Sequence, residues 1–248
     1  MKNLAILQAR TGSSRLPGKV LKQINGKPMI EWQILRILES EVDNLVLATS
    51  NDESDDELAK VVEELGIDVF RGALNDVHSR FLAILTTTKP DYFMRLTGDC
   101  PVVMPDLVNS MMTEFELLQL DYLSNLNPPT YPDGLDVEII STKVFLDYSN
   151  TALTAEDLEH VTIGMRQRPG QIKIRNFENA QDFSKMRWTV DYEEDLAFIR
   201  EVFKFFITNE LGFKMEDILR AIESGQIREN LISGSFRNIS LSKGTQND

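Results

Sequence analysis

The sequence predicts an α/β protein built on a mostly parallel, doubly wound sheet. In its first half, short apolar runs alternate with amphipathic segments, which is the pattern of strands connected by helices. The apolar runs are continuous rather than alternating, as expected for strands that are covered by helices on both faces. Right-handed crossovers between such strands give a three-layer, Rossmann-like sandwich.

The first-half elements follow from apolar runs and helix-end signals. Strands are expected at residues 3–9, 44–49, 67–72 and 91–97, and helices at 28–39, 52–66, 75–87 and 105–119. Pro28 suits the first turn of a helix because its φ is already helical. The helix at 52–66 begins with acidic residues and ends at Gly66, which complements the helix dipole and favours a C-terminal cap.

The second half is less regular. Residues 124–141 contain three prolines and one glycine before a short strand. Further on we expect a helix at 154–169, antiparallel-type strands at 171–177 and 185–190, and helices at 192–206 and 215–225. The expected organisation is one domain over residues 1–235, with an insertion at roughly 125–180, and a polar tail at 236–248.

Composition excludes several classes of protein. With 26 basic and 39 acidic residues among 248, the net charge is −13, which disfavours binding to nucleic acid or to an anionic membrane. No apolar run is long enough to suggest a membrane span. The single cysteine, Cys100, cannot form an internal disulfide, so we expect a cytoplasmic protein.

Basic residues are concentrated at the start of the chain. Residues 1–30 contain six lysines and arginines and no acidic residue. Three of these cations, Arg10, Arg15 and Lys19, lie in the stretch QARTGSSRLPGKVL (8–21), directly after the first expected strand. Its glycines allow backbone N–H groups to approach a phosphate closely. The stretch matches neither a Walker A motif nor GxGxxG, so an ordinary turn with solvated cations remains an equal alternative.

Two aspartates follow later expected strands. Asp99 in RLTGDCP (95–101) sits at a strand end, where a carboxylate beside a polyphosphate indicates Mg²⁺, although a turn aspartate bonded to its own backbone is the commoner case. Asp191 in WTVDYEEDL (188–196) fits either a metal ligand or a helix cap paired with Glu194. Cys100 is expected to be a buried, inert thiol.

The combination of motifs resembles the cytidylyltransferases that activate sugar acids. The opening LQARTGSSRLPGKVLKQINGKPMIEW resembles the start of the acylneuraminate and 3-deoxy-octulosonate enzymes. RLTGDCP, DGLDVEIIS, EHVT and WTVDYEEDL look most like the spore coat polysaccharide biosynthesis protein F branch. The resemblance covers roughly residues 1–205. It implies a nucleotidyltransferase α/β sandwich with an inserted arm for substrate binding and homodimer formation.

The resemblance also implies roles for individual residues. The family pattern Arg-x-x-Ser-x-Arg-Leu-Pro-x-Lys wraps the triphosphate of CTP. The implied nucleotide-binding residues are Ala9, Arg10, Gly12, Ser13, Arg15, Lys19 and Arg80. Asp99 and Asp191 would bind Mg²⁺, and these two with Arg10 and Lys19 form the implied catalytic set. Arg80 could equally be a solvated cation one turn after Asp76.

The resemblance is less specific about the residues that bind the acceptor sugar. The implied substrate-binding residues are Asp133, Asp136, Glu138, Glu159 and His160. A Pro-Asp-Gly turn leading into a strand also accounts for the first three, and a structural role also accounts for His160. The octulosonate enzymes have Gly-Asp-Glu-Pro where this chain has Gly-Asp-Cys-Pro, which leaves the identity of the sugar open.

The expected reaction is attack of a sugar hydroxyl on the α-phosphorus of CTP, with release of pyrophosphate and formation of a CMP-sugar. The expected partners are CTP, a sugar acid and a second copy of the chain. A glycosyltransferase of similar fold is an alternative, but no Asp-x-Asp motif stands at a strand end. A catalytically silent nucleotide-binding scaffold is the second alternative.

Overall fold

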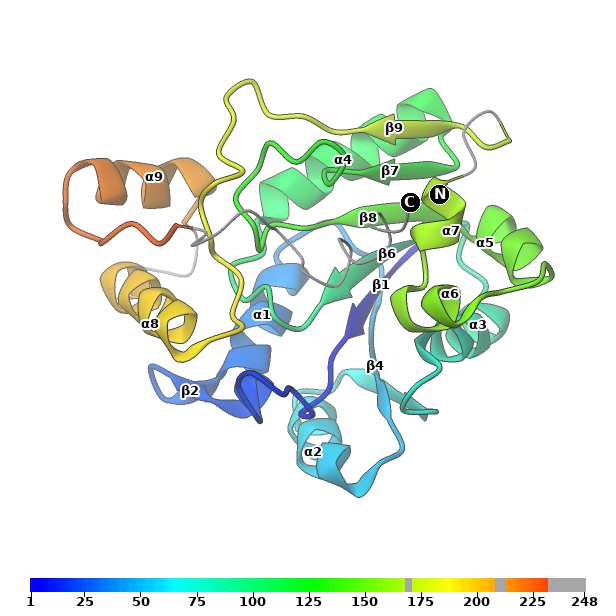
Figure 1. Ribbon diagram of the computed structural model, residues 1–248, viewed down its shortest axis with the longest axis horizontal. Helices are drawn as coiled ribbons and strands as arrows, with labels where there is room; N and C mark the ends of the chain where they lie inside the picture. Colours follow the sequence, from blue (N-terminus) through cyan, green and yellow to red (C-terminus); the bar gives the residue numbers. More distant parts are fainter. Residues whose placement is uncertain (168–170, 208–212, 232–248) are drawn as a thin grey trace, which may run out of the picture.

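A seven-stranded sheet lies at the centre of the computed structural model, which describes residues 1–167, 171–207 and 213–231 (Figure 1). The strand order is β5-β4-β1-β6-β8-β7-β9. The bounds are β1 Asn3–Gln8, β4 Leu45–Ser50, β5 Asp68–Gly72, β6 Tyr92–Thr97, β7 Tyr122–Ser124, β8 Glu138–Ser141 and β9 Ile174–Asn176. A small hairpin joins β2, Gln23–Ile24, to β3, Lys27–Pro28. The expected mostly parallel α/β fold is confirmed.

The directions of the strands define the ligand-binding edge. The neighbouring pairs from β5 to β6 are all parallel, and Gln8 of β1 lies opposite Ala48 of β4 and Thr97 of β6. β8 runs antiparallel to both β6 and β7. Residues of the expected insertion thus contribute β8 and β9 to the central sheet.

Helices cover both faces of the sheet. Their bounds are α1 Met29–Leu38, α2 Asp56–Glu64, α3 Val77–Thr88, α4 Pro105–Leu118, α5 Thr142–Ser149, α6 Ala155–His160, α7 Ile163–Arg166, α8 Glu193–Ile207 and α9 Met215–Glu223. Short 3₁₀ helices occupy Lys19–Leu21 (η1) and Glu53–Asp55 (η2). No helix in these described ranges is both long and apolar enough to span a membrane.

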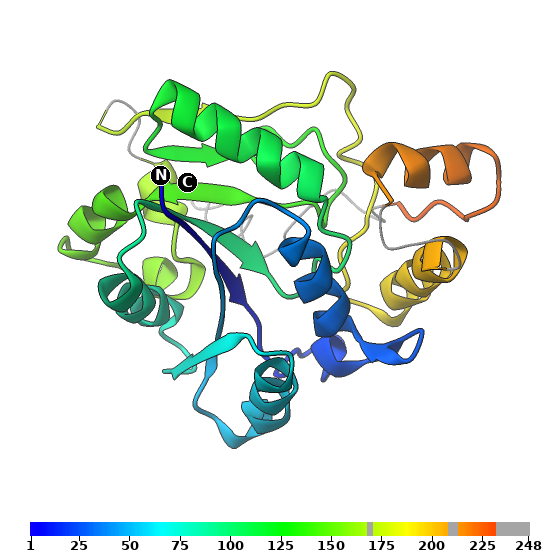
Figure 2. The same cartoon turned by 180° about the vertical axis from the view of Figure 1, so that it is seen from behind.

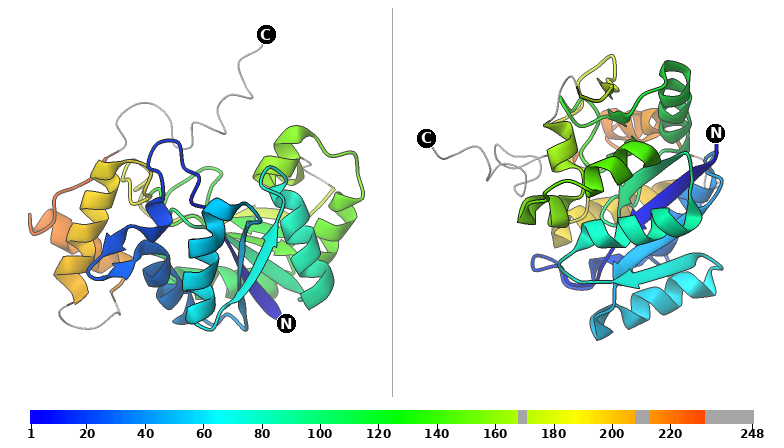
Figure 3. Two further views of the ribbon diagram at one scale, coloured as in Figure 1. Left: turned by 90° about the horizontal axis from the view of Figure 1, so that it is seen from below. Right: turned by 90° about the vertical axis from the view of Figure 1, so that its right-hand side faces the viewer.

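Each face of the sheet has its own apolar core. Leu7 and Met94 pack with α1, α2, α4, α8 and α9, whereas Ile6 and Phe93 pack with α3, α5 and α7. Figure 2 shows α1 and α4 on the first face, and the side views in Figure 3 place the sheet between the two groups of helices. Burial on both faces explains why the first-half strands read as continuous apolar runs.

Two expected strands differ from the structure. Within 171–177 only Ile174–Asn176 is a strand, and it pairs in parallel with β7 rather than in the antiparallel way expected. Residues 185–190 form no ladder among the described residues; they make isolated bridges from Arg187 to Asp133 and from Met186 to Leu231. The apolar alternation there reflects the burial of Trp188 and Val190 against several different partners, not strand pairing.

The helix expected at 154–169 is two short helices, with residues 168–170 lying outside the described part of the chain. The break falls at Val161, which has a φ of 64° and is fully buried in the second core. The next residue, Thr162, donates its hydroxyl to Glu138 Oε1 at 2.7 Å. Burial of Val161 and this bond therefore override the helical propensity of the segment.

Gly134 lies where residues 131–135 cross residues 187–190. Its φ is 111°, and a Cβ atom there would lie 2.4 Å from the backbone nitrogen of Thr189. Gly66, at the end of α2, also has a positive φ of 76°, but a Cβ atom there would meet nothing within 4 Å. Substitution at Gly66 therefore tests backbone strain alone, whereas substitution at Gly134 tests backbone strain together with steric overlap.

We expect Gly134→Ala to lower the free energy of unfolding by roughly 2–4 kcal/mol, because it adds overlap to an unfavourable φ. Gly66→Ala, the control, should cost about 1 kcal/mol from the backbone alone. Urea unfolding monitored by tryptophan fluorescence measures both. Equal losses for the two variants would show that the crossing at Gly134 is not tight.

Candidate active site

The site lies at the edge of the sheet where β1 and β6 end. After β1 the chain adds β4 and β5 on one side of β1 and then β6 on its other side. The gap between β1 and β6 is therefore a topological switch point, which is where ligands bind in α/β folds. The loop 9–18 follows β1, and the turn at 98–100 follows β6. A cleft of about 800 Å³ opens at these two segments, and a second cavity of about 170 Å³ adjoins it.

The two cavities divide the residues singled out in the sequence. The nucleotide-binding set lines the larger cleft together with both metal candidates: Ala9, Arg10, Gly12, Ser13, Arg15, Lys19, Arg80, Asp99 and Asp191. Glu159 also lines the larger cleft, and Asp133, Asp136 and Glu138 line the smaller cavity. Asp99 and His160 belong to both walls. The structure thus brings every candidate to one place, and their individual roles stay predictions.

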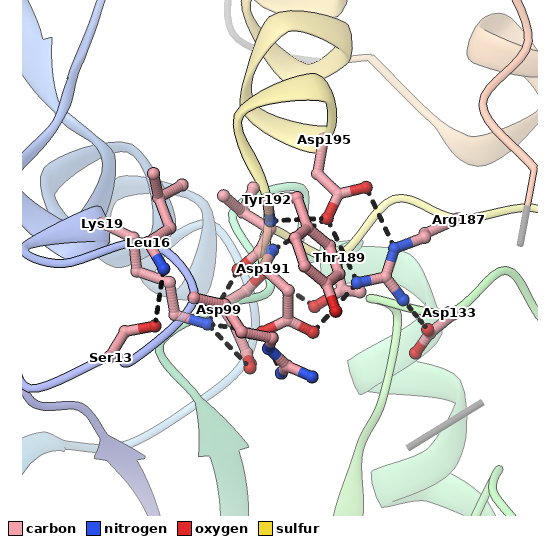
Figure 4. Close-up of polar contacts among 12 residues, drawn as sticks. Ser13, Leu16, Lys19, Asp99, Asp133, Arg187, Thr189, Asp191, Tyr192 and Asp195 are labelled. Atoms are coloured by element: carbon pink, nitrogen blue, oxygen red, sulfur yellow. Dashed lines mark hydrogen bonds and ion pairs between the residues drawn. The ribbon is translucent and has the colours of Figure 1, made fainter. Parts of the chain in front are cut away.

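The loop after β1 has its own internal hydrogen bonds. The Thr11 carbonyl accepts from the backbone nitrogens of Ser13, at 2.8 Å, and Gly18, at 3.0 Å. Leu16 is buried and donates its N–H to Ser13 Oγ at 3.2 Å (Figure 4). Gly18 closes the loop at a φ of 65°, a conformation that favours glycine. The loop is therefore a defined turn anchored at Leu16.

Lys19 joins the two aspartates. Its ammonium donates to Asp191 Oδ1 at 2.9 Å, to the Val190 carbonyl at 2.7 Å and to Asp99 Oδ2 at 3.3 Å (Figure 4). Burial alone would lower the pKa of Lys19, but Asp99 and Asp191 outweigh burial and raise it above its usual value. Burial would likewise raise the pKa of each aspartate, but the ammonium outweighs it and lowers both. All three groups are therefore charged at neutral pH.

Arg187 holds the other side of Asp191. It donates to Asp191 Oδ2 at 2.9 Å, to Asp133 Oδ2 at 3.1 Å and to Asp195 Oδ1 at 3.0 Å. Asp195 Oδ2 accepts the N–H groups of Asp191, at 2.9 Å, and Tyr192, at 3.0 Å. The carboxylate at the start of α8 that accepts backbone N–H groups is thus Asp195. The Asp191 carboxylate instead faces the cleft, where Arg15 also contacts it at 2.7 Å.

Glu138 organises the smaller cavity. Its buried carboxylate accepts from Arg95, from the Tyr122 hydroxyl and from Thr162, and Arg166 Nε lies 3.8 Å away. Burial alone would raise the pKa of Glu138, but Arg95 and Arg166 outweigh it and lower the pKa to about 2. The carboxylate therefore fixes two arginines that line the cavity.

Two cations that line the larger cleft, Arg10 and Arg80, form no ion pair with a carboxylate among the described residues. Arg80 is 1% exposed, and its only hydrogen bonds there are long ones to the carbonyls of Ala48, at 3.4 Å, and Leu74, at 3.5 Å. Burial, followed by repulsion from Arg10, lowers the pKa of Arg80. Two neighbouring guanidinium groups that form no ion pair with a carboxylate can bind an anionic ligand.

Sequence reasoning missed three arginines of the site. Arg95 had a signal, because a cation inside an otherwise apolar strand points to a buried acidic partner. Arg166 looked like an ordinary basic residue at the C-terminal end of a helix. Arg187 lay in an expected strand, and nothing in the local sequence indicates that its side chain bonds to three aspartates.

The oxygen atoms around Lys19 suit a divalent cation. Within residues 1–167, 171–207 and 213–231, no cluster of three or more histidine, cysteine, aspartate or glutamate side chains could hold a metal. Asp99 and Asp191, however, already surround one cation, the Lys19 ammonium, with oxygen atoms. Mg²⁺ commonly takes one or two carboxylates and completes its shell with phosphate and water. The donor set therefore fits Mg²⁺ in the presence of a polyphosphate.

The ion pairs of Glu138 predict a pH-dependent contribution to stability. A carboxylate whose pKa is depressed in the folded state contributes above its ordinary pKa of 4.5, and the contribution is lost as the pH falls toward 2. We expect Glu138→Gln to be less stable than the wild type by roughly 2–4 kcal/mol at pH 7, with the gap narrowing between pH 5 and pH 3. Denaturant unfolding across this range measures the gap. Glu194→Gln, at an exposed glutamate, is the control, and a gap for Glu138→Gln that does not change with pH would contradict the account.

Comparisons with known proteins agree with this geometry. The family model described as Cytidylyltransferase matches residues 4–232. Spore coat polysaccharide biosynthesis protein SpsF of Bacillus subtilis is 34% identical over 209 residues, which cover 81% of this chain and 86% of that protein. The 3-deoxy-manno-octulosonate cytidylyltransferase 1 of Hydrogenovibrio crunogenus is 30% identical over 62% of this chain and 60% of its own length.

A solved structure extends the similarity to three dimensions. A cytidylyltransferase from Leptospira borgpetersenii superimposes with a TM-score of 0.88 at 27% identity, covering 94% of this chain and all of that one. The family model and this structure each span nearly the whole described fold, including the cleft after β1 and β6. The chain therefore belongs to the cytidylyltransferase family.

Proposed function

We propose that this protein transfers CMP from CTP to a sugar acid, releases pyrophosphate, and serves the synthesis of a surface polysaccharide or glycan. The names of the similar proteins from Bacillus and Hydrogenovibrio support the polysaccharide and the sugar acid. The observation that carries the proposal is the shared wall of the two cavities: Asp99 borders both the cation-lined cleft and the smaller cavity. A nucleotide and an acceptor bound in the two would meet there.

CTP is assigned to the larger cleft, with its triphosphate against the loop 9–18. Arg10, Arg15 and Lys19 would neutralise the pyrophosphate as it leaves, and Arg80 adds a buried positive charge beside Arg10. The acceptor hydroxyl attacks the α-phosphorus while the bond to the bridging oxygen of pyrophosphate breaks. Such a reaction requires mainly positioning and charge neutralisation, which this set of cations provides.

Lys19 changes partners in this scheme. In the structure its ammonium binds Asp99 and Asp191, which are candidate Mg²⁺ ligands. Contact with the entering phosphates would draw the ammonium away from the carboxylates and leave their oxygen atoms to a metal ion. Mg²⁺ held by Asp99 and Asp191 would supply charge neutralisation at the phosphate and favour ionisation of the attacking hydroxyl.

The acceptor is assigned to the smaller cavity. Asp136 and His160 line it and can bond to sugar hydroxyl groups. Asp133 and Glu138 also line it, and each is engaged with an arginine, Arg187 or Arg95. For these two we propose that they hold the arginines in place. Glu159, on the wall of the larger cleft, would contact the sugar where the two ligands meet.

Two further parts of the proposal concern the setting of the enzyme. The family resemblance supports a homodimer. The single cysteine, buried and without a disulfide, supports a reducing cytoplasm.

Pyrophosphate release tests the function. The protein should release pyrophosphate from CTP when Mg²⁺ and a suitable sugar acid are both present, and should do so poorly with UTP, GTP or ATP. A coupled pyrophosphate assay over a panel of sugar acids and neutral sugars measures this. Absence of release with CTP and every acid tested, or transfer of sugar from a nucleotide-sugar instead, would contradict the proposal.

Matched variants tie the activity to the site. Asp99→Asn should lower the rate on the order of 100-fold or more, because it removes one carboxylate from the shared wall. Its melting temperature should change little, since asparagine keeps an oxygen to accept from Thr97 and Lys19 keeps its bonds to Asp191 and to the Val190 carbonyl. Asp147→Asn, at an exposed aspartate of α5, should retain full activity. Retained activity in Asp99→Asn would remove Asp99 from the mechanism.

A further inference from the structure

A buried carboxylate behind the loop 9–18 has no part in the reaction described so far. Asp55 ends η2, just after β4, and is 1% exposed. Among the described residues no cation forms an ion pair with it. A carboxylate that is buried without a cation needs several hydrogen bonds to remain charged.

Asp55 obtains these bonds from two residues. Thr11 donates both its backbone N–H, at 2.7 Å, and its hydroxyl, at 2.8 Å, to Asp55 Oδ1. Ser50 donates its backbone N–H, at 3.3 Å, and its hydroxyl to Asp55 Oδ2. Burial alone would raise the pKa of Asp55, but these bonds outweigh it and lower the pKa. The Asp55 carboxylate is therefore ionised, and each of its oxygen atoms accepts hydrogen bonds.

Thr11 is the residue on which the loop closes. Its carbonyl accepts from Ser13 and Gly18, so it bonds to both the start and the end of the turn. Its N–H and hydroxyl face the other way, toward Asp55, and the hydroxyl also lies 2.9 Å from the Ser54 carbonyl. Arg10 immediately precedes it and Gly12 follows it. The placement of Thr11 therefore sets the direction in which the cationic loop leaves β1.

We propose that Asp55 is a positioning residue for the triphosphate: by fixing Thr11 it holds the loop 9–18 in the conformation that binds the β- and γ-phosphates. This inference rests on the proposed function. Asp55 acts through Thr11 and does not line the cleft. Only a carboxylate suits the place, because an asparagine would offer one acceptor oxygen and would turn an NH₂ group toward the donors of Thr11 or Ser50.

The test compares CTP with CMP, because CMP lacks the two phosphates that the loop is proposed to hold. Isothermal titration calorimetry should show CTP binding weakened about 10-fold or more by Asp55→Asn and by Thr11→Val, with CMP binding changed less than about twofold. The double variant should bind CTP about as well as Asp55→Asn alone, because the hydroxyl bond that Thr11→Val removes is one of the bonds that Asp55→Asn disrupts. Thr11→Ser, which keeps the hydroxyl, should restore most of the affinity.

Steady-state kinetics give a second readout. The KM for CTP should rise in Asp55→Asn and Thr11→Val while the KM for the sugar acid stays within about twofold, a split that general loss of stability would not produce. Asp52→Asn is the matched control, because Asp52 lies in the same segment and is exposed, and its carboxylate accepts its hydrogen bonds from Ser54 rather than from the loop 9–18. This variant should bind both nucleotides normally.

The outcomes separate the two proposals. Wild-type affinity for CTP in Asp55→Asn or Thr11→Val, or equal weakening of CTP and CMP, overturns the positioning role while leaving the proposed function intact. If the wild-type protein binds neither nucleotide, the proposed function fails and this inference fails with it. Where Asp55→Asn does not fold, Thr11→Val tests the same interaction from the half-buried Thr11 side.

Discussion

The ammonium of Lys19 ties together three segments that are distant in the sequence. It bonds to Asp99 at the end of β6, 80 residues away, and to Val190 and Asp191 before α8, 171 and 172 residues away. Without this cation, Asp99 would have no ion pair among the described residues while lying beside a second carboxylate, and an unpaired carboxylate in a protein interior is costly. The position of the loop after β1 and the position of the segment before α8 are therefore mutually dependent.

The two cavities of the site differ in the charged side chains that line them. Arg10 and Arg80 line the larger cleft and form no ion pair with a carboxylate in the described chain, whereas the smaller cavity is lined by Asp133, Asp136 and Glu138 together with the arginines Arg95 and Arg166. The remaining surface is strongly acidic, since the net charge is −13 although residues 1–30 contain only basic charges. Such a distribution of charge favours binding of a polyphosphate at the cationic residues of the larger cleft.

The features that the sequence predicted correctly are those that depend on local patterns of residues. Continuous apolar runs predicted β1, β4 and β6 because burial on both faces imposes that pattern. Glycines and the cations Arg10, Arg15 and Lys19 made the loop a candidate phosphate site, because a phosphate requires small and cationic residues together, and the family resemblance favoured that interpretation over an ordinary turn.

The features that the sequence left open or predicted wrongly depend on residues distant in the sequence. The Asp-x-x-Glu spacing at Asp191 is the same whether that residue caps α8 or faces the cleft, and only the structure shows Asp195 accepting the backbone N–H groups. The alternation at 185–190 recorded burial against several segments, and that at 171–177 did not specify the parallel pairing of β9. The break at Val161 arises from packing in the second core. Asp55, buried among polar donors, left no pattern in the sequence at all.

Binding of Mn²⁺, a probe for Mg²⁺, tests most directly whether Lys19 occupies the place of the metal. Electron paramagnetic resonance of free Mn²⁺ measures the affinity in the absence of nucleotide. Lys19→Met should bind Mn²⁺ about 10-fold or more tightly than the wild type, because it removes the competing charge from Asp99 and Asp191. Lys22→Met, at a neighbouring lysine that pairs with Glu193, should bind like the wild type. Unchanged or weaker Mn²⁺ binding in Lys19→Met would contradict the account.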